Sequence, residues 1–348
     1  MEIVDILIKN ANEIISLKGP NRPRTKKEMN DLKIIKNGSI AIKDGKIFDI
    51  GKNLKYKSKK TIDAKGKTVL PGFVDPHTHL VFAGSREFEL DWKLKGFSYL
   101  DIKKKGGGIS YTVKQTRKAS ENELFNGAKK RLDKMLSYGT TTCEAKSGYG
   151  LNTESELKIL KVQKKLKEKH KIDIVSTFLG AHAIPKEQSA SEYINTVVDE
   201  MLPKVKKYAK FCDVFCEKGF FTYDQSKRIL ESGLKNGLKP KIHAARKMID
   251  AGVAIALATD LNPNCYVENM QFMIQLACFN MKMTPAEAIC AATFNAACAI
   301  DKNNEIGSLE TGKKADILIM DCSNHLQIPY HFGINHVINV IKKGIVLI

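Results

Sequence analysis

Two histidines separated by one residue close an apolar stretch of the chain. His77 and His79 end residues 73–79, which have the composition of a buried strand. Alternate side chains of a strand point to one face, so both imidazoles can bind the same cation. The spacing alone leaves a metal site and a chance pair of histidines equally open.

Two further apolar stretches end in residue types that bind metals, namely His243 and Asp260. The carboxyl ends of strands in a parallel barrel converge on one mouth, so these groups can join the histidine pair around one ion. The structural alternative makes His243 a hydrogen-bonded core histidine and Asp260 a helix cap. The convergence of three strand ends favours the metal site.

Three imidazoles and one carboxylate form a ligand set for one divalent ion, Zn²⁺ or Fe²⁺. Such an ion lowers the pKa of a bound water to near neutral and supplies hydroxide as a nucleophile. Asp260 could accept the water proton and pass it to a departing nitrogen. The pattern therefore predicts hydrolysis of an amide-like bond or deamination, and it fits several first-row metals.

Short apolar strands alternate with longer helical stretches from Phe73 onward, which is the rhythm of βα units around a parallel sheet. One predicted helix opens with a capping box, since Ser120 precedes Glu123 by three residues. We expect strands at residues 73–79, 140–146, 172–182, 212–217, 239–243 and 253–260, and helices at 120–138, 153–170, 223–236 and 284–300.

Both ends of the chain have strand character instead. The first seventy residues alternate apolar and polar, and Asp44-Gly45 is a strong hairpin signal. Residues 315–320 are again strand-like, so we expect the tail to rejoin the first strands. The sequence thus predicts an α/β protein with a composite β domain, residues 1–70 and 303–348, and a (β/α) barrel over residues 71–302.

Composition places the chain among globular proteins without a membrane partner. It has 348 residues, 43% of them hydrophobic, and no stretch is apolar enough to span a bilayer. Its start lacks the pattern of a secretory signal, so we expect a cytoplasmic protein.

The eight cysteines form no C-x-x-C pair. Cys212 and Cys216 fit a buried strand better than a metal pair.

The net charge of +19 comes mostly from lysine. Nucleic-acid readers favour arginine forks and interleaved aromatic residues, whereas the lysine-rich residues 164–169 are typical of a solvated helix face. We therefore expect no nucleic-acid partner.

Longer strings of sequence resemble a known family. The frame Gly66-Lys-Thr-Val-Leu-Pro-Gly-Phe-Val-Asp-Pro-His-Thr-His and the string Gly307-Ser-Leu-Glu-Thr-Gly-Lys-Lys-Ala-Asp-Ile resemble the amidohydrolase superfamily. The strings Phe82-Ala-Gly-Ser-Arg-Glu, Lys146-Ser-Gly-Tyr-Gly-Leu, Phe178-Leu-Gly-Ala-His-Ala-Ile-Pro and Pro329-Tyr-His-Phe-Gly-Ile-Asn-His are similar to the imidazolonepropionase family within it. The resemblance implies a distorted (β/α)₈ barrel, a β-sandwich built from both chain ends, and a homodimer.

The resemblance also implies roles for single residues. A guanidinium such as Arg86 can hold the propionate of the family's substrate through two charge-assisted hydrogen bonds. Without the resemblance, a surface charge, a turn tyrosine and a core histidine stay open for Arg86, Tyr149 and His182. The implied metal ligands are His77, His79, His243 and Asp260, and the implied substrate contacts are Arg86, Tyr149, His182 and Asn262.

The chain departs from the family pattern after His243. Members continue there with Ala-Asp-Glu and two more strand and helix units, whereas here only 260 − 243 = 17 positions separate His243 from Asp260. The missing part includes the family's catalytic glutamate, and Arg246 at the corresponding position cannot act as that acid. An opened barrel also exposes strand edges. We expect a fold lacking two βα units, in a non-functional deletion product or a much weakened hydrolase.

The resemblance thus predicts metal-dependent hydrolysis of the cyclic amide of 4-imidazolone-5-propanoate to N-formimino-L-glutamate in histidine degradation. One alternative is a related amidohydrolase reaction such as deamination of a heterocycle, which would not need a carboxylate clamp at Arg86. The other is a catalytically dead remnant that still binds metal or small acids.

Overall fold

The first strands follow the alternation of apolar and polar residues. The computed structural model describes residues 2–217, 219–242 and 253–348. Strands β2 (Ile34–Lys43) and β3 (Lys46–Lys52) pair antiparallel around Asp44-Gly45, and both turn residues have positive φ, at 50° and 74°. Tight hairpins require this backbone conformation, which aspartate tolerates and glycine favours. The predicted hairpin is therefore confirmed.

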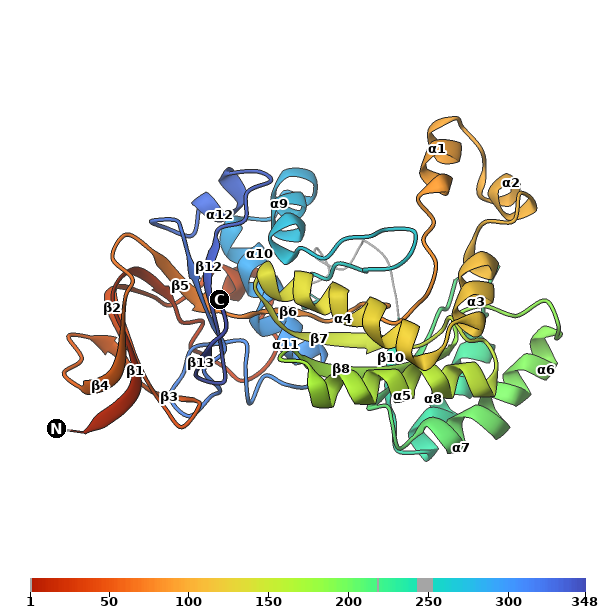
Figure 1. Cartoon of the computed structure of the whole chain (residues 1–348), viewed down its shortest axis with the longest axis horizontal. Coiled ribbons are helices and arrows are strands. Elements are labelled where there is room, and N and C mark those ends of the chain that lie inside the picture. The colour runs from red at the N-terminus through yellow and green to blue at the C-terminus, as the bar shows by residue number, and fades with distance from the viewer. Residues whose placement is uncertain (1, 218, 243–252) are drawn as a thin grey trace.

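Strands from both chain ends share one sheet at one end of the molecule (Figure 1). Within the described residues its order is β13-β12-β11-β5-β1-β2-β3, and β4 also pairs with β1. That this sheet is a sandwich domain with the predicted boundaries stays a prediction. The other strands of this sheet are β1 (Ile3–Ile15), β4 (Lys57–Asp63), β5 (Thr68–Pro71), β11 (Ile317–Met320), β12 (Val337–Lys342) and β13 (Ile345–Val346).

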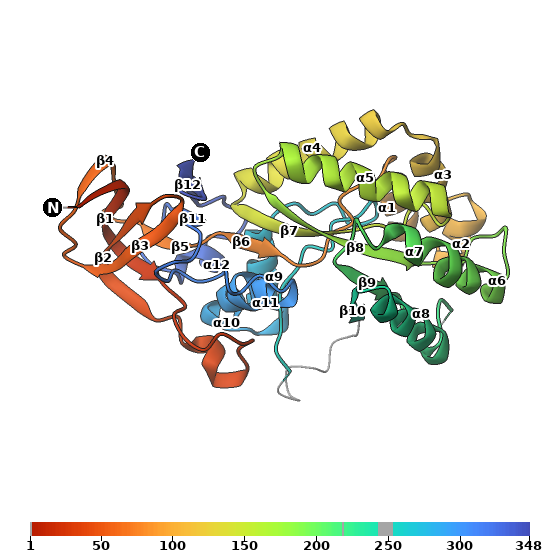
Figure 2. The same cartoon turned by 90° about the horizontal axis from the view of Figure 1, so that it is seen from below.

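A parallel sheet forms the other half of the fold, with the order β10-β9-β8-β7-β6 among the described strands (Figure 2). Five of the six predicted strands are found in it. The first ends earlier than expected, because Pro76 has no N–H to continue the ladder. The strands are β6 (Phe73–Asp75), β7 (Thr140–Lys146), β8 (Asp173–Ala181), β9 (Phe211–Val214) and β10 (Lys239–Ile242).

The sixth predicted strand, residues 253–260, is not a regular strand. Its end does run parallel to the first strand's extension, since Thr78 and Leu261 form an isolated parallel bridge. Leu257, however, donates its N–H to Ala291 rather than to a strand. A strand forms only where a ladder continues, and within the described part of the chain this segment has ladder contacts at one end alone.

Helices α4 (Glu121–Ser137), α5 (Thr153–Lys169) and α8 (Tyr223–Lys235) match the predictions and pack on the parallel sheet (Figure 2). Ser120 and Glu123 form the predicted capping box. Leu124, Ala128 and Leu132 are fully buried at the i, i+4, i+8 spacing of one helix face. Each of these helices therefore owes its stability to an apolar face against the strands.

The predicted helix over residues 284–300 is instead two helices, α10 (Pro285–Ala292) and α11 (Phe294–Ala299). Thr293 breaks it, with φ −129° and ψ −86°, and its hydroxyl donates to the carbonyl of Ile289 at 2.6 Å. Such a bond competes with the helical backbone. The other helical segments are α1 (Phe88–Leu94), α2 (Tyr99–Lys104), α3 (Ile109–Lys118), α6 (Ala190–Asn195), α7 (Leu202–Val205), α9 (Met270–Met281) and α12 (Gln327–Tyr330), the 3₁₀ segment η1 (Lys26–Asn30) and the π segment η2 (Thr196–Met201).

Length and apolar character set the helices apart from membrane spans. Within the described ranges, none of them combines enough length with enough apolar character to cross a bilayer.

Candidate metal-dependent active site

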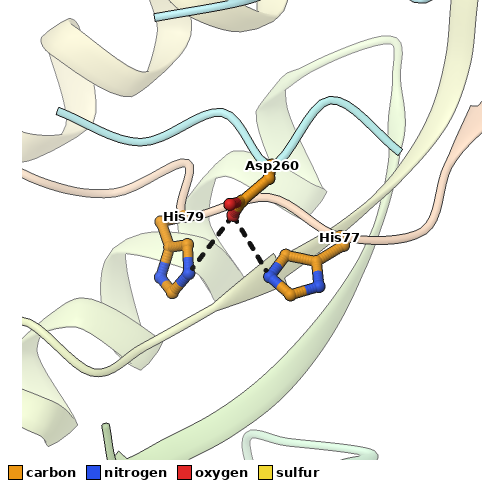
Figure 3. Close-up of side chains that lie close together, drawn as sticks. All are labelled: His77, His79 and Asp260. Atoms are coloured by element: carbon orange, nitrogen blue, oxygen red, sulfur yellow. Dashed lines mark ion pairs between the residues drawn. The ribbon is translucent and has the colours of Figure 1, made fainter. Parts of the chain in front are cut away.

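Three of the four predicted metal ligands lie together at the carboxyl end of the parallel sheet (Figure 3). The Asp260 Oδ1 atom is 3.3 Å from Nε2 of His77 and 3.7 Å from Nε2 of His79. Their ligand atoms all lie within 4.8 Å of one another. His79 is buried, whereas the Asp260 side chain is 60% exposed, so the group faces an accessible space. The fourth predicted ligand, His243, lies outside the described residues.

A buried carboxylate joins the segment of Asp260 to the strand of the histidines. Asp75 ends β6 and is fully buried. It accepts the hydroxyl of Thr259 at 2.5 Å and the backbone N–H of Thr259 at 3.2 Å. Burial raises the pKa of Asp75 to about 7, although these hydrogen bonds oppose the rise. The residues flanking the three ligands are thus fixed to each other inside the protein.

Backbone hydrogen bonds also join the segment of Asp260 to the segment of the two histidines. Asp260 donates its N–H to the His77 carbonyl at 3.1 Å, and His79 donates to the Leu261 carbonyl at 2.8 Å. Asp260 itself has φ +48°, a left-handed conformation that aspartate tolerates better than most residues. The turn therefore directs this carboxylate toward the two imidazoles.

A charged network lies inside the sheet, beside the candidate metal-binding group. The Lys146 ammonium donates to Glu144 at 2.7 Å and to Asp213 at 2.6 Å, and all three side chains are at most 1% exposed. Burial lowers the pKa of Lys146, but the two carboxylates outweigh burial and raise it above its ordinary value. Lys241 adds a contact of 3.3 Å to Glu144. Three buried charges and the half-buried Lys241, from three strands in all, therefore neutralise one another.

Tyr149 and His182 form an aromatic wall with His79. The rings of His79 and His182 stack with centroids 4.8 Å apart, and the Tyr149 ring lies 5.3 Å from His79. Nδ1 of His182 donates to the Gly148 carbonyl at 2.9 Å, so its proton lies on that nitrogen. Burial raises the pKa of Tyr149 well above its ordinary value, and its hydroxyl stays protonated.

The loop that carries Tyr149 is held by a buried carboxylate that sequence analysis did not single out. Glu156, in the first turn of α5, accepts the backbone N–H groups of Gly148 and Gly150 at 2.9 and 2.7 Å. The Tyr149 ring is thereby fixed between two glycines bonded to the same side chain. A carboxylate at a helix N-terminus is a sequence feature that could have indicated this role.

Arg86 faces the cavity but already has a buried partner. Its Nε and Nη2 atoms donate to the two carboxylate oxygens of Glu89, each at 2.7 Å. Burial raises the pKa of Glu89, yet the hydrogen bonds from Arg86 and Gly108 hold it below its usual value. The guanidinium is thus oriented and partly neutralised before any ligand arrives, which sequence reasoning did not predict.

Asn262 also reaches the cavity, although its polar atoms serve the loop. Its Nδ2 donates to the Asp260 carbonyl at 2.6 Å, and its Oδ1 accepts the backbone N–H of Asn264 at 2.8 Å. Such an arrangement is an Asx turn. Asn262 therefore shapes the loop that follows Asp260.

One cavity of about 250 Å³ collects every described residue of the predicted site. Its apolar members, Ile109, Phe215 and Phe220, were not predicted, because isolated apolar residues in loops carry no pattern that separates a pocket wall from the core. The lining residues are His77, His79, Arg86, Ile109, Tyr149, His182, Phe215, Phe220, Asp260, Asn262 and Asn264.

A larger cavity of about 660 Å³ lies elsewhere and holds none of the predicted site residues. It is lined by the beginning of β8 and by lysines such as Lys164 and Lys207. In parallel α/β folds the chemistry sits at the carboxyl ends of the strands, so the smaller cavity is the candidate active site.

The donor set of that cavity fits a divalent cation. Two imidazole nitrogens and a carboxylate oxygen are common ligands of zinc and of other first-row metals. Their present separations bring the three atoms around one point.

Comparisons with known proteins show which sequences this chain resembles. Two models described as "Amidohydrolase family" match residues 162–347 and 60–96. Imidazolonepropionase of Alkaliphilus metalliredigens (strain QYMF) is 47% identical over 411 aligned residues, covering 98% of this chain and 97% of the relative. Imidazolonepropionase of Geobacillus kaustophilus (strain HTA426) is 43% identical over 414, covering 99% and 98%.

The solved structures show the same fold at low identity. A Xaa-Pro dipeptidase with bound methionine superposes with a TM-score of 0.69 at 14% identity, over 98% of this chain and 99% of that one.

The alignment to the Alkaliphilus relative is longer than this chain by 411 − 348 = 63 positions.

Proposed function

Because this chain belongs to the imidazolonepropionase family of amidohydrolases, we propose that its cavity acts on 4-imidazolone-5-propanoate and opens the cyclic amide to N-formimino-L-glutamate. The observation that carries the proposal is the convergence of His77, His79 and Asp260 on one point of that cavity. Hydrolysis in histidine degradation is the activity of this family, and the site geometry suits it.

Each end of the substrate has a chemical counterpart in the cavity. The propionate is an anion, and Arg86 is the arginine among the lining residues. Because Glu89 holds two of its nitrogens, the guanidinium offers its remaining N–H donors in a fixed direction. His182 lines the same cavity, and its ring is held by the hydrogen bond from Nδ1 to the Gly148 carbonyl, so it can contact the imidazolone ring.

The residues that would hold the metal are His77, His79, His243 and Asp260. A bound Zn²⁺ or Fe²⁺ would supply a water of lowered pKa and would polarise the ring carbonyl. The Asp260 side chain is 60% exposed and lines the cavity, so its carboxylate could take up a proton from the attacking water and return it to the ring nitrogen as the amide bond breaks.

We further propose that the chain lacks two βα units between β10 and residue 253. The alignment with the Alkaliphilus relative is 63 positions longer than this chain, which supports the proposal. So does the sheet order, because β10 ends the described parallel sheet while Leu261 pairs beyond its opposite edge, at Thr78. The family's catalytic glutamate falls in the missing part, so turnover should be much weaker than in full-length relatives.

A heterocycle deaminase is the first alternative. It would act on a neutral base and would leave the buried Arg86 without a ligand to bind. A catalytically dead remnant is the second, and the short stretch after His243 favours it. The homodimer implied by family resemblance belongs to the same proposal, and a cytoplasmic location stays a prediction.

Metal content and turnover of the purified chain separate these possibilities. We expect about one divalent metal per chain and slow loss of 4-imidazolone-5-propanoate, abolished in Asp260→Asn. Bound metal with turnover of guanine instead would favour the deaminase. Bound metal without any turnover would favour the remnant, and turnover equal to that of the Alkaliphilus enzyme would refute the effect of the deletion.

A further inference from the structure

The cavity of about 660 Å³ lies at the opposite end of β8 from the candidate active site. Asp173 begins β8 and lines this cavity, whereas His182 directly follows the strand and lines the other one. At about 3.3 Å per residue, the 182 − 173 = 9 positions between them place the two ends roughly 30 Å apart. A ligand in the 660 Å³ cavity would therefore not occupy the candidate active site.

Lysine is concentrated in the lining of this cavity. Lys and Arg together are 57 of the 348 residues, so 16 lining residues would hold 16 × 57/348, or about 2.6, at the average composition. The lining holds more than twice that number, so it is not an average sample of a basic surface. Its lysines are Lys164, Lys167, Lys207, Lys210, Lys302 and Lys314.

Two of the carboxylates in the lining already have cationic partners. Glu305 forms ion pairs with Lys302, at 2.6 Å, and with Lys314. Asp173 forms an ion pair with the buried Lys342 at 2.9 Å. These two carboxylates are therefore not available to neutralise the other lysines of the cavity.

Three lysines of the lining keep an uncompensated charge. Lys164 and Lys167 lie on α5, on one face because they are three residues apart, and Lys207 follows α7. All three are exposed, and within the described ranges their ammonium groups form no ion pair or hydrogen bond. Glu168 is the remaining lining carboxylate. Three cations thus face one anion, and α5 packs along β8 so that they meet at the beginning of that strand (Figure 2).

We propose that this cavity binds a polyphosphate chain, free or as part of a nucleotide. An ammonium is a compact point charge that suits phosphate, whereas carboxylates are read by the planar fork of arginine, as at Arg86. No arginine is found among the described residues of the lining. Linked phosphates can reach ammonium groups on two separate elements, which a single phosphate cannot do equally well.

The size and the remaining wall of the cavity suit such a ligand. Its 660 Å³ lies within the range of small-molecule sites, about 300–1,000 Å³. The Tyr208 ring also lines it, with the Lys207 ammonium 5.2 Å from the ring centroid. A nucleotide base could stack on this ring while its phosphates contact the lysines. The inference goes beyond the proposed hydrolysis and does not rest on it.

Calorimetric titration of the full chain with sodium tripolyphosphate tests the proposal. We expect one tripolyphosphate per chain, displaced by ATP, and much weaker binding of orthophosphate. The double variant Lys167→Gln/Lys207→Gln should bind tripolyphosphate roughly 10-fold more weakly or worse, because it loses two charge-assisted contacts. Tighter binding of ATP than of tripolyphosphate would assign the site to a nucleotide, and equal binding would assign it to the phosphate chain itself.

Two controls separate this cavity from general charge and from the metal site. Lys118→Gln/Lys130→Gln removes the same charge from exposed lysines outside the lining, and it should change the affinity by less than about 2-fold. Asp260→Asn should bind tripolyphosphate as wild type does. Circular dichroism checks that each variant is folded. If the variant at Lys167 and Lys207 unfolds, Lys207→Gln alone decides.

Four results would overturn the proposal. They are several tripolyphosphate ions per chain, equal weakening in the two lysine double variants, loss of binding in Asp260→Asn, and a chain that binds duplex DNA but no tripolyphosphate. None of them bears on the hydrolase proposal, which metal content and turnover test.

Discussion

The Thr259 hydroxyl donates to the buried Asp75 carboxylate at 2.5 Å, across 184 positions of sequence. Asp75 precedes His77 by two residues, and Thr259 directly precedes Asp260. One hydrogen bond therefore joins the two segments that carry His77, His79 and Asp260, the candidate metal-binding group. The geometry of the site depends on this internal contact as well as on the ligands themselves.

Thr259→Val should weaken metal binding. The substitution keeps the side-chain shape but removes the hydroxyl donor. Asp260 is then held less firmly in position relative to the two histidines. Groups that orient ligands typically change metal affinity by about 10- to 100-fold. Competition with a zinc chelator measures the change, and Thr259→Ser serves as the control that keeps the donor. An unchanged affinity in Thr259→Val would show that the backbone bonds suffice.

Lys146→Met should destabilise the fold strongly. The change removes the cation that the buried carboxylates of Glu144 and Asp213 share, and Lys241 then faces both of their negative charges. Breaking a buried pair in this way costs about 3–5 kcal/mol. Urea unfolding measures the loss. Lys165→Met is the comparison, because its ion pair with Glu121 is exposed and should be worth less than about 1 kcal/mol. Equal losses for both variants would contradict the role of the buried network.

Glu89→Gln should weaken the binding of a carboxylate ligand. Arg86 would lose the charged partner that orients it, and hydrogen bonds to charged groups are worth about 1.5–3 kcal/mol. We expect roughly 10-fold weaker binding of 3-(imidazol-4-yl)propanoate by calorimetry. Binding of 4-ethylimidazole, which has no carboxylate, should change little. Equal weakening of both ligands would mean that the variant damages the cavity as a whole.

The ion pairs of Asp301 beside β10 should contribute a stability that depends on pH. It accepts from Lys239, the first residue of β10, at 2.5 Å and from Lys210 at 2.9 Å. These hydrogen bonds lower the pKa of Asp301 to about 2 in the folded state. The stabilisation is therefore present above the unfolded-state pKa of about 4 and disappears as the pH falls toward 2.

Asp301→Asn should thus lower the free energy of unfolding at pH 7 but leave it unchanged near pH 2. The side chain is 45% exposed, so the loss at pH 7 should be below about 1 kcal/mol. Denaturant unfolding across this pH range measures it, with Asp91→Asn as the surface control. A difference that persists unchanged at low pH would rule out the ion pairs as its source.

Much of the fold follows from local patterns in the sequence. The hairpin at Asp44-Gly45 and the cap at Ser120 depend on residues adjacent in sequence, and both are found as predicted. The break at Thr293 depends on the hydrogen bond from its buried hydroxyl to the Ile289 carbonyl. The periodicity of apolar residues in the sequence does not reveal such a bond. The irregular segment before Asp260 depends on which strands lie beside it, a property of the whole sheet.

The candidate site was predictable where residue type alone fixes the chemistry. His77, His79 and Asp260 could be found because each ends an apolar segment, and those segments meet at the carboxyl end of the parallel sheet although the one before Asp260 is not a regular strand. The partner of Arg86 could not, because Glu89 is an ordinary helix residue in sequence, and for Glu156 only its place in the first turn of a helix gave a signal. Their roles appear only when burial removes water as a competing partner.

The most direct test of the metal site is anomalous diffraction from zinc-soaked crystals, measured on both sides of the zinc edge. We predict one strong peak about 2.0–2.2 Å from Nε2 of His77, Nε2 of His79 and a carboxylate oxygen of Asp260. The peak should vanish in Asp260→Asn crystals grown and soaked in the same way. No peak at these three residues, or one equally strong in the variant, would contradict the proposed centre.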